Sequence, residues 1–527
     1  MVMTTATRAL SLRGRQVPVV FPNVRDARLH TAAVIISIHF IGITALGFRV
    51  SVPQILIAIL TAGLLDVALT YPKSGNLVWP ASGMLTGSGV ALILRITGMG
   101  SGEYWSWEGW YWFALVAGAS LLTTYFITFR GRHIFNPSNI GLVLAFLIVG
   151  SNVIEPLDFW WAPPGPYMIL AYALIIGGGI AITQRLYLLE MALAFWAVLA
   201  MGLAVLSLSG HCMIATWSPG PVCGGYFWAS LVSSPEVLIF LFFMITDPKT
   251  VPTGREARVA FAAPLALAAT LLIAPNTVEY GAKVGLLGSL ALWSPMRSLF
   301  ERWLPAAEAQ VGPGSAGIIR SLAAATTVRV FARGAIFGVI AVLGVVAIVA
   351  AGIPARSLSA YTAPTPEVAF PLELDDSSLP QVTVDPSVSQ LAIAADDEFV
   401  ESVTQMLAEN LAGEAEAIRT ADGSILGFTS GGDRLTEMQA RLDAAIATGE
   451  REASFYSFDS LHLSAHEAIG QVSAGLVFTA IGTIESVRYD SDGNEIGREA
   501  GQFESAFVLR QLAGERWVIV SVVMETD

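Results

Sequence analysis

Long apolar runs dominate the first two thirds of this chain and restrict what it can fold into. A run of about 18 or more apolar residues can cross the hydrocarbon core of a bilayer as a helix. Only 13% of the 527 residues are charged, whereas soluble domains carry about 25% charged residues. The sequence therefore predicts a polytopic α-helical membrane protein. Its ten to eleven expected spanning helices lie near residues 31–49, 52–70, 80–97, 110–128, 137–151, 165–183, 186–208, 233–246, 258–275, 279–296 and 333–352.

Basic residues recur in every other loop between these runs, for example at Lys73, Arg132, Arg185 and Arg255, and the remaining loops are acidic and aromatic. The positive-inside rule then places the basic loops in the cytoplasm. The basic segment 1–30 lacks the apolar core and cleavage site of a signal peptide, so we expect it to be retained on the same side. We expect a bacterial cytoplasmic (inner) membrane protein with its N-terminus cytoplasmic.

The balance of charge changes sharply near residue 353. Residues 353–527 hold 9 Lys+Arg and 29 Asp+Glu, a net charge of −20. Eleven crossings would place this acidic part on the periplasmic or extracellular side, and its charge argues against nucleic acid as a partner. The expected domains are a cytoplasmic N-terminal segment at 1–30, a membrane bundle at 31–305, a cytoplasmic linker at 306–332, an additional spanning helix at 333–352, a linker at 353–392 and an acidic domain at 393–527.

Two polar segments that contain Pro, at 133–141 and 244–254, interrupt the apolar sequence. A backbone that leaves the helical ladder inside a membrane must be covered by protein or line a watery cavity. Two such breaks, one in each half of a membrane domain, are typical of a site near the midplane or its cytoplasmic edge.

Asp247 is the carboxylate of the second segment, and the hydroxyls of Thr246 and Thr250 lie close to it in sequence. Such a set suits a cation, a proton or the polar edge of a cofactor. The alternative is structural, because Asp247 could simply cap the following helix or pair with Lys249 or Arg255.

In the first segment, Asn136 has the character of a helix N-cap, with Pro137 at the first helical position and Ser138 after it. A helix N-terminus that faces the protein interior can hold an anion or a phosphate. A third segment, at 82–89, is rich in Gly, Ser and Thr and includes Ser82, Gly83 and Thr86. Close helix packing is its structural alternative. His39, alone in the first run, is expected to be hydrogen-bonded rather than a haem ligand.

The only two cysteines, Cys212 and Cys223, fall in a loop that the topology places outside. An oxidising compartment permits a disulfide there, which we favour over two free thiols. Two cysteines are too few for a zinc site, and no metal site is expected.

The segments Ser82–Gly87, Phe135–Pro137, Ile245–Thr250 and Glu279–Leu287 occur in the order seen in one membrane family. Over roughly residues 30–305 the chain resembles the D subunit of the Rnf electron-transport complex and the B subunit of the sodium-translocating NADH:quinone reductase, including a branch associated with enediyne clusters. The resemblance implies an inverted-repeat bundle and electron transfer through flavin, coupled to ion movement. The implied cofactor-binding residues are Ser82, Gly83, Thr86, Asn136, Ser138, Thr246, Asp247 and Thr250.

The chain departs from that family because the motif whose Thr carries covalent FMN is absent. Asp66–Thr70 and Met213–Thr216 are the nearest strings, and neither fits. We therefore expect non-covalent FMN, riboflavin or quinone, in a subunit of a larger membrane complex. Two alternatives remain: an accessory subunit without redox activity, and a transporter of a small solute or cation. No catalytic residue is identified.

Beyond the membrane part, the pattern predicts helices near 394–412 and 434–448 and strands near 453–461, 471–488, 498–511 and 516–524. Residues 490–494 are typical of a hairpin turn. This order is similar to nuclear-transport-factor-2-like folds, which implies a soluble α+β domain with a cone-shaped curved sheet. Asp459, His462 and His466 could form an acid–base set, although surface positions are the favoured interpretation.

Overall fold

The computed structural model describes most of the chain and divides it into two compact units. The helical unit comprises residues 1–211 and 223–355, and the C-terminal unit comprises residues 212–222 and 356–527. The predicted linker at 306–332 and most of the linker at 353–392 lie outside the described residues. The described residues are 7–12, 15–97, 99–100, 102–162, 164–215, 217–218, 221–303, 342–353, 379–390, 396–466, 475–491, 493–511 and 516–524.

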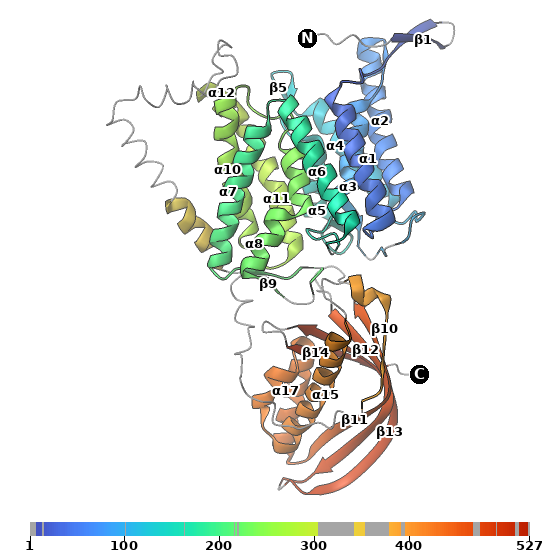
Figure 1. Cartoon of the computed structure of the whole chain (residues 1–527), viewed down its shortest axis with the longest axis vertical. Coiled ribbons are helices and arrows are strands. Elements are labelled where there is room, and N and C mark those ends of the chain that lie inside the picture. The colour runs from blue at the N-terminus through green and yellow to red at the C-terminus, as the bar shows by residue number, and fades with distance from the viewer. Residues whose placement is uncertain are drawn as a thin grey trace. The chain divides into compact units, whose positions relative to one another are not determined.

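Six helices of the helical unit are long and apolar enough to cross a membrane (Figure 1). They are α1 Ala27–Ala45, α2 Val52–Ser74, α6 Pro166–Arg185, α7 Leu189–Leu208, α10 Arg255–Ile273 and a composite helix, Gly224–Met244. In their most apolar windows, 78% of the composite helix is buried against 28–44% of the other five. The composite helix is therefore the central one of the six.

The composite helix consists of α8 Gly224–Ser233, α9 Pro235–Ile239 and a π-helical turn, η1 Phe240–Met244. Its predicted start near residue 233 is wrong. The hydroxyl of Ser234 accepts hydrogen bonds from the main-chain N–H groups of Glu236 and Val237. Pro at the first position of α9 needs no such bond, so Ser234 and Pro235 restart a helix that began nearly three turns earlier, at Gly224.

The remaining helices of this unit are shorter. They are α3 Ala81–Ile93, α4 Trp110–Phe126, α5 Pro137–Val149, α11 Glu279–Trp293, the 3-10 turn η2 Ser294–Met296, α12 Arg297–Trp303 and an apolar helix at Val342–Ala351. Because α3 and α5 have 13 residues each, each is about 20 Å long. That length falls short of a hydrocarbon core of about 30 Å.

Both short helices continue as extended chain. β4 Leu94–Ile96 follows α3, β7 Ile154–Pro156 follows α5, and the two strands pair antiparallel with every residue buried. The pairing gives hydrogen-bond partners to backbone that has left the helical ladder, as a nonpolar environment demands. The other small strands of this unit are β1 Thr7–Leu12, β2 Arg15–Val20, β3 Leu77–Val78, β5 Thr128–Phe129 and β6 Arg132–His133. A further pair of short strands, β8 Cys212–Met213 and β9 Val222–Cys223, belongs to residues 212–222 of the C-terminal unit except for Cys223.

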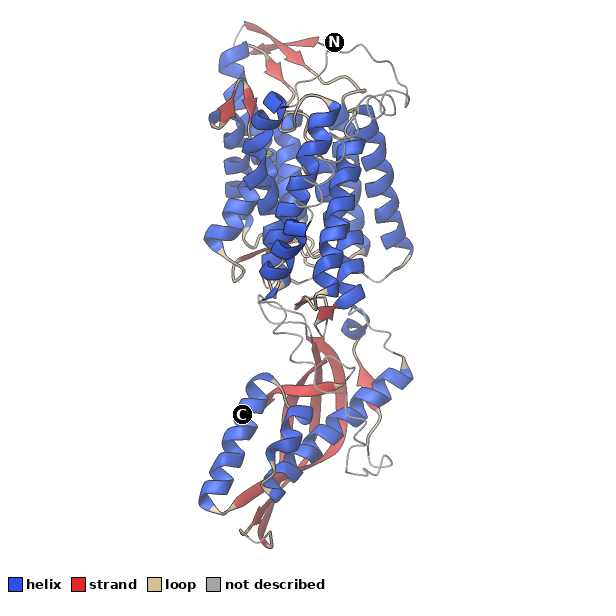
Figure 2. Cartoon of the chain, turned by 90° about the vertical axis from the view of Figure 1, so that its left-hand side faces the viewer, coloured by secondary structure: helices blue, strands red, loops and turns tan. Residues whose placement is uncertain are grey.

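Small residues let the helices of this unit pack closely side by side (Figure 2). A Cβ atom added to Gly87 of α3 would overlap the carbonyl oxygen of Ala58 in α2. One added to Gly141 of α5 would overlap Ser120 in α4. Close approach through glycine is how helices associate in a lipid environment. The packing interpretation of the 82–89 segment therefore holds for Gly87.

The C-terminal unit is a five-stranded sheet with helices on one face (Figure 1). The strand order is β10-β11-β12-β13-β14, and β10 joins β11 in parallel while the other pairs are antiparallel. The turn predicted at 490–494 joins β12 to β13, and Gly493 in it has φ 84°. The elements are β10 Val382–Val384, η5 Pro386–Gln390, α15 Asp397–Thr420, η6 Gly423–Ile425, α16 Leu426–Thr429, α17 Gly432–Thr448, β11 Arg451–His466, β12 Gly475–Tyr489, β13 Glu495–Gln511 and β14 Trp517–Met524.

The core of the C-terminal unit lies between α15 and the sheet. Leu407 of α15 packs with Phe478 of β12 and Phe507 of β13, all fully buried. Each such side chain stabilises the fold by about 1.5–3 kcal/mol relative to exposure. Within the described residues β10 and β14 are open edges of the sheet. The curved sheet was predicted, but closure into a cone is not present there.

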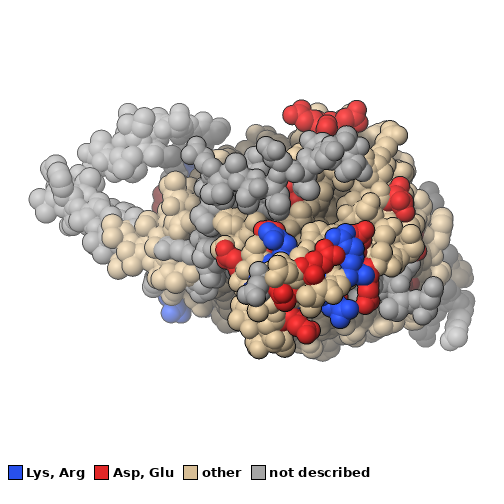
Figure 3. Space-filling model, turned by 90° about the horizontal axis from the view of Figure 1, so that it is seen from below, with Lys and Arg blue, Asp and Glu red and all other residues tan. Residues whose placement is uncertain are grey.

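Charged side chains cover the far end of the long β12–β13 hairpin. Seen from below, basic groups lie among acidic ones (Figure 3). Arg498 forms ion pairs with Glu485 at 2.8 Å and with Glu495 at 3.0 Å. These pairs are exposed, so each contributes little to stability.

Candidate functional site

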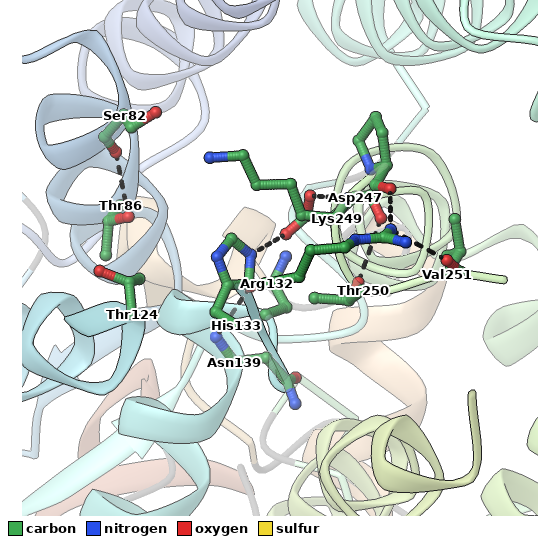
Figure 4. A network of polar contacts seen from close by, with 12 residues as sticks. Ser82, Thr86, Thr124, Arg132, His133, Asn139, Asp247, Lys249, Thr250 and Val251 are labelled. Atoms are coloured by element: carbon green, nitrogen blue, oxygen red, sulfur yellow. Dashed lines mark hydrogen bonds and ion pairs between the residues drawn. The ribbon is translucent and has the colours of Figure 1, made fainter. Parts of the chain in front are cut away.

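The two Pro-containing segments meet in the folded chain. The amide Nδ2 of Asn136 donates a hydrogen bond to the carbonyl oxygen of Met244 at 3.1 Å. His133 Nε2 lies 3.0 Å from Asp247 Oδ2, with both side chains mostly buried. Figure 4 shows the contact between His133 and Asp247. We call Asn136, Met244, His133 and Asp247 the junction. It joins the start of α5 to the end of the composite helix, which sequence periodicity alone does not place together.

Basic side chains hold the loop that follows Asp247. The Arg132 guanidinium donates to the carbonyl oxygen of Pro248 at 2.6 Å and to that of Val251 at 3.2 Å. Arg297 donates to the carbonyl oxygen of Lys249. These charge-assisted bonds use backbone carbonyls that a Pro-broken helix leaves free. The loop is therefore fixed by contacts within the chain.

The prediction that Asn136 caps α5 is confirmed. Its Oδ1 accepts a hydrogen bond from the Asn139 N–H at 3.2 Å, and Ser138 Oγ donates to the same oxygen at 3.0 Å. Since its Nδ2 also donates to the Met244 carbonyl, both ends of the Asn136 amide are in use. Thr246, another predicted residue, donates from Oγ1 to the Phe242 carbonyl at 2.5 Å.

Asp247 neither caps the following helix, α10, whose N-cap is Gly254, nor pairs with the side chain of Lys249 or Arg255. Its Oδ1 accepts from the main-chain N–H of Lys249 at 2.9 Å, and its carbonyl accepts from Thr250 Oγ1 at 3.1 Å. Arg255 pairs with Glu190 instead, and the partner of Asp247 is His133. A flavin or quinone bound at the junction would have to compete with these internal hydrogen bonds.

The predicted residues of α3 have partners other than the junction. The N–H of Gly83 donates to Asp66 Oδ2 at 3.1 Å, and the Tyr125 hydroxyl donates to the other oxygen of Asp66. Arg28 donates to Ser82 Oγ at 3.1 Å. Thr86 donates to the Ser82 carbonyl at 3.0 Å, as Figure 4 shows. The eight predicted site residues therefore form two groups, one at or next to the junction and one in α3 with partners in α1, α2 and α3 itself.

Four buried ionisable side chains, which we call the charge network, form a second polar centre. Arg95 in β4 lies 2.5 Å from one oxygen of Asp158, and Lys283 in α11 lies 3.0 Å from the other. Lys283 also lies 3.1 Å from Glu279, which is fully buried. Glu279 further accepts the main-chain N–H of Phe159 at 2.8 Å. The network joins elements from both halves of the helical unit.

The junction and the charge network lie at opposite ends of an antiparallel helix pair. Near the start of α5, Asn139 donates to the carbonyl of Leu287, late in α11, at 2.9 Å. At the start of α11, the Tyr280 hydroxyl donates to the carbonyl of Phe146, late in α5, at 2.7 Å. The two polar centres are therefore separated by roughly the length of α5, about 20 Å.

The charge network was missed as a unit by the sequence analysis. Asp158 was assigned to an acidic loop, and Glu279 and Lys283 were noted only as part of a family segment. An available signal was that Arg95 and Lys283 are single cations inside apolar stretches. An ionisable residue inside a membrane segment is by default a candidate for function.

The predicted disulfide between Cys212 and Cys223 is confirmed. His211, directly before it, is fully buried and lies against Phe227, with ring centroids 4.6 Å apart and the ring planes tilted by 53°. Neither ring nitrogen of His211 has a hydrogen-bond partner among the described residues. Burial lowers the pKa of His211 to about 4, so this ring is neutral at physiological pH.

Three other predictions concern His39, the pair Asp459 and His462, and His466. His39 is hydrogen-bonded as expected, with its Nε2 3.3 Å from the Ser88 carbonyl. Asp459 and His462 are exposed on the sheet, which supports their interpretation as surface residues. The side chain of His466 lies outside the described part of the structure. Among the described residues no cluster of three His, Cys, Asp or Glu could hold a metal ion.

No protein-family model and no curated protein matches the chain. Among solved structures, the intermembrane space region of chloroplast protein ARC6 is similar at 13% identity, over 26% of this chain and 100% of that chain, with a TM-score of 0.20. A likeness this weak carries no argument about fold or function. The resemblance to Rnf D-type subunits stays a prediction.

Proposed function

We propose that the helical unit moves a proton or a small cation across a membrane. The charge network is the observation that supports this most directly. Removing an ion from water costs several kcal/mol even in real proteins, and a buried ion pair repays that cost poorly. Four such groups, in β4, after β7 and in α11 of a unit that also holds six membrane-length helices, are therefore better explained by ion movement than by stability.

The two polar centres suit a path through the bundle. The junction and the charge network lie at the two ends of α5 and α11, and each has a carboxylate beside a cation or a histidine. Broken helices with polar ends are the usual means of building ion sites inside membrane transporters. In this proposal, ions enter at one centre and leave past the other.

Reconstitution into liposomes tests the proposal. The full chain would be placed in vesicles with an imposed membrane potential, and a pH-sensitive and a sodium-sensitive dye would report entry of either ion. We expect flux in the wild type and a strong loss in Asp247→Asn and Asp158→Asn. Glu256→Gln is the matched control, because Glu256 is an exposed carboxylate. Absence of flux of either ion in the wild type would reject the proposal.

We also propose, on the resemblance, that this bundle serves as a subunit of a membrane electron-transport complex with non-covalently bound flavin or quinone. What favours it is the contact between Asn136 and Met244, since Asn136 belongs to one segment shared with that family and Met244 directly precedes another. A visible spectrum with flavin bands, or quinone in an organic extract of the purified protein, is the expected result. A colourless protein without flavin or quinone would reject this second proposal, and an accessory role or ion transport would remain.

The orientation is part of the same proposal. Arg132, Lys249, Arg255 and Arg297 all lie at or next to the junction, so the positive-inside rule assigns the junction to the cytoplasmic side. The acidic C-terminal unit would then face the periplasm or exterior and serve to dock other subunits. Protease access to the C-terminal unit in intact cells tests this, and protection from an external protease would reverse the assignment.

A further inference from the structure

Glu236 is a buried carboxylate that no other part of the site explains. It is the second residue of α9, directly after the break at Ser234 and Pro235 in the central composite helix. Its side chain is 1% exposed. Neither of its carboxylate oxygens has a hydrogen-bond partner among the described residues. Buried polar groups are almost always bonded, so an unpartnered carboxyl group at a helix break points to a ligand.

The charges that act on Glu236 come from the charge network. They are Lys283 and Glu279 of α11, Asp158 after β7 and Arg95 of β4. The elements packed along the composite helix add no further charge near it. α8 and η1 contain none, and the single charged residue of α6 is Arg185 at its far end, where it donates to the Arg25 carbonyl. The charged residue of α7 is Glu190 in its first turn, where it pairs with Arg255.

A charge count shows that Glu236 is the extra anion. Arg95 and Lys283 supply two positive charges, and Asp158 and Glu279 supply two negative ones. Arg49 and Glu155, whose charges also act on Asp158, add one charge of each sign when both are ionised, so the group without Glu236 sums to zero. An ionised Glu236 would add a net negative charge in a dry interior, which is strongly unfavourable. Glu236 therefore needs a cation that neutralises it. When that cation leaves, the charge network must compensate the negative charge of the carboxylate.

We propose that Glu236 is a proton-binding site in the centre of the helical unit. The proposal rests on the proposed ion-moving function and names its ion. Protonation forms one O–H bond on the Glu236 carboxylate, and release returns the proton to water or to a neighbouring base, with no oxidation or reduction. A metal cation would need a shell of several oxygen ligands, and the described residues offer no acidic or histidine cluster to supply one. A proton needs only the carboxylate.

Infrared difference spectroscopy of the full chain in lipid nanodiscs tests the site without relying on transport. The carbonyl stretch of a protonated carboxylic acid should be present in the wild type at neutral pH and titrate at high pH. Glu236→Gln, which mimics the neutral form in shape, should remove this band, and Glu256→Gln should leave it unchanged. Glu236→Asp should shift the band, which decides the matter if the Gln variant does not fold. A band unchanged in both Glu236 variants overturns the proposal.

Two further arms separate the possible failures. Replacing choline chloride by sodium chloride at constant pH should leave the band in place, and its loss would show that the site takes sodium instead. In vesicles, proton flux should be lost in Glu236→Gln. Undiminished flux in that variant would overturn the role of Glu236 while the proposed function stands. A titrating band without any wild-type flux would keep the site and reject the function.

Discussion

The side-chain amide of Asn136 caps α5 with its oxygen and donates from its nitrogen to the carbonyl of Met244, 3.1 Å away. One side chain thus starts a helix in the first half of the helical unit and holds the end of the central helix from the second half. The contact ties two segments that are 108 residues apart in the chain.

Replacing Asn136 separates these two roles. Asn136→Ser keeps a cap and loses the bond to Met244, which should cost about 1 kcal/mol. Asn136→Ala loses both, for a total of about 2 kcal/mol. Unfolding in mixed detergent micelles measures the difference. Equal stability of the two variants would show that the cap contributes nothing.

Lys283 balances two buried carboxylates, Asp158 and Glu279. Lys283→Met should destabilise the protein by about 3–5 kcal/mol, because it leaves buried charge uncompensated. Adding Glu279→Gln removes one of the two carboxylate charges that Lys283→Met leaves unpaired, so the double variant should recover part of the lost stability. Thermal unfolding of the wild type and the three variants forms a complete cycle. Strict additivity of the two single effects would contradict direct coupling.

The disulfide between Cys212 and Cys223 should form in the native membrane. A maleimide added to denatured membranes should label neither cysteine unless a reductant is present. The double variant Cys212→Ser with Cys223→Ser should lose about 2–4 kcal/mol of stability. Labelling without reductant would show that this loop lies in a reducing compartment, against the proposed orientation.

The stability of the helical unit should fall in mild acid because of His211. Burial lowers the pKa of His211 to about 4, whereas an unfolded histidine has a pKa near 6.5. Between these values the unfolded chain binds more protons, so the free energy of unfolding falls as pH drops through that window. The full stabilisation is present above about pH 6.5 and the loss approaches about 3 kcal/mol near pH 4.

Melting temperatures measured between pH 7.5 and 4.5 test this dependence. In His211→Phe the aromatic contact with Phe227 is kept and the proton uptake is removed, so the acid sensitivity should shrink. His30→Gln, a change at an exposed position, is the matched control and should behave as the wild type. An unchanged pH profile in His211→Phe would disprove the assignment to this ring.

Local patterns predicted the helices well because run length and composition are local quantities. Helices lie within or close to each of the eleven predicted runs, although α3 and α5 end before the runs that predicted them. The start of the composite helix was misjudged because Ser234 and Pro235 look like a beginning. They form a restart inside a helix whose first turn, near Tyr226 and Phe227, already packs against neighbours.

The polar sites were harder to predict because their partners are distant in sequence. Arg95, Asp158 and Lys283 meet across up to 188 residues of chain, and no periodicity encodes such a meeting. The same holds for His133 and Asp247, which are 114 residues apart. The sequence showed that each segment was unusual, whereas only the fold shows which of them are neighbours.

The shortness of α3 and α5 has an electrical consequence. In a bilayer the membrane voltage falls across the insulating layer, about 2.3 kcal/mol per unit charge at 100 mV. α3 and α5 each end after about 20 Å, and the buried strand that follows α3 carries Arg95 of the charge network. In the proposed function, a proton that moves along α5 and α11 to Glu236 would cross only part of the insulating layer, so it would gain or lose only the matching part of that energy.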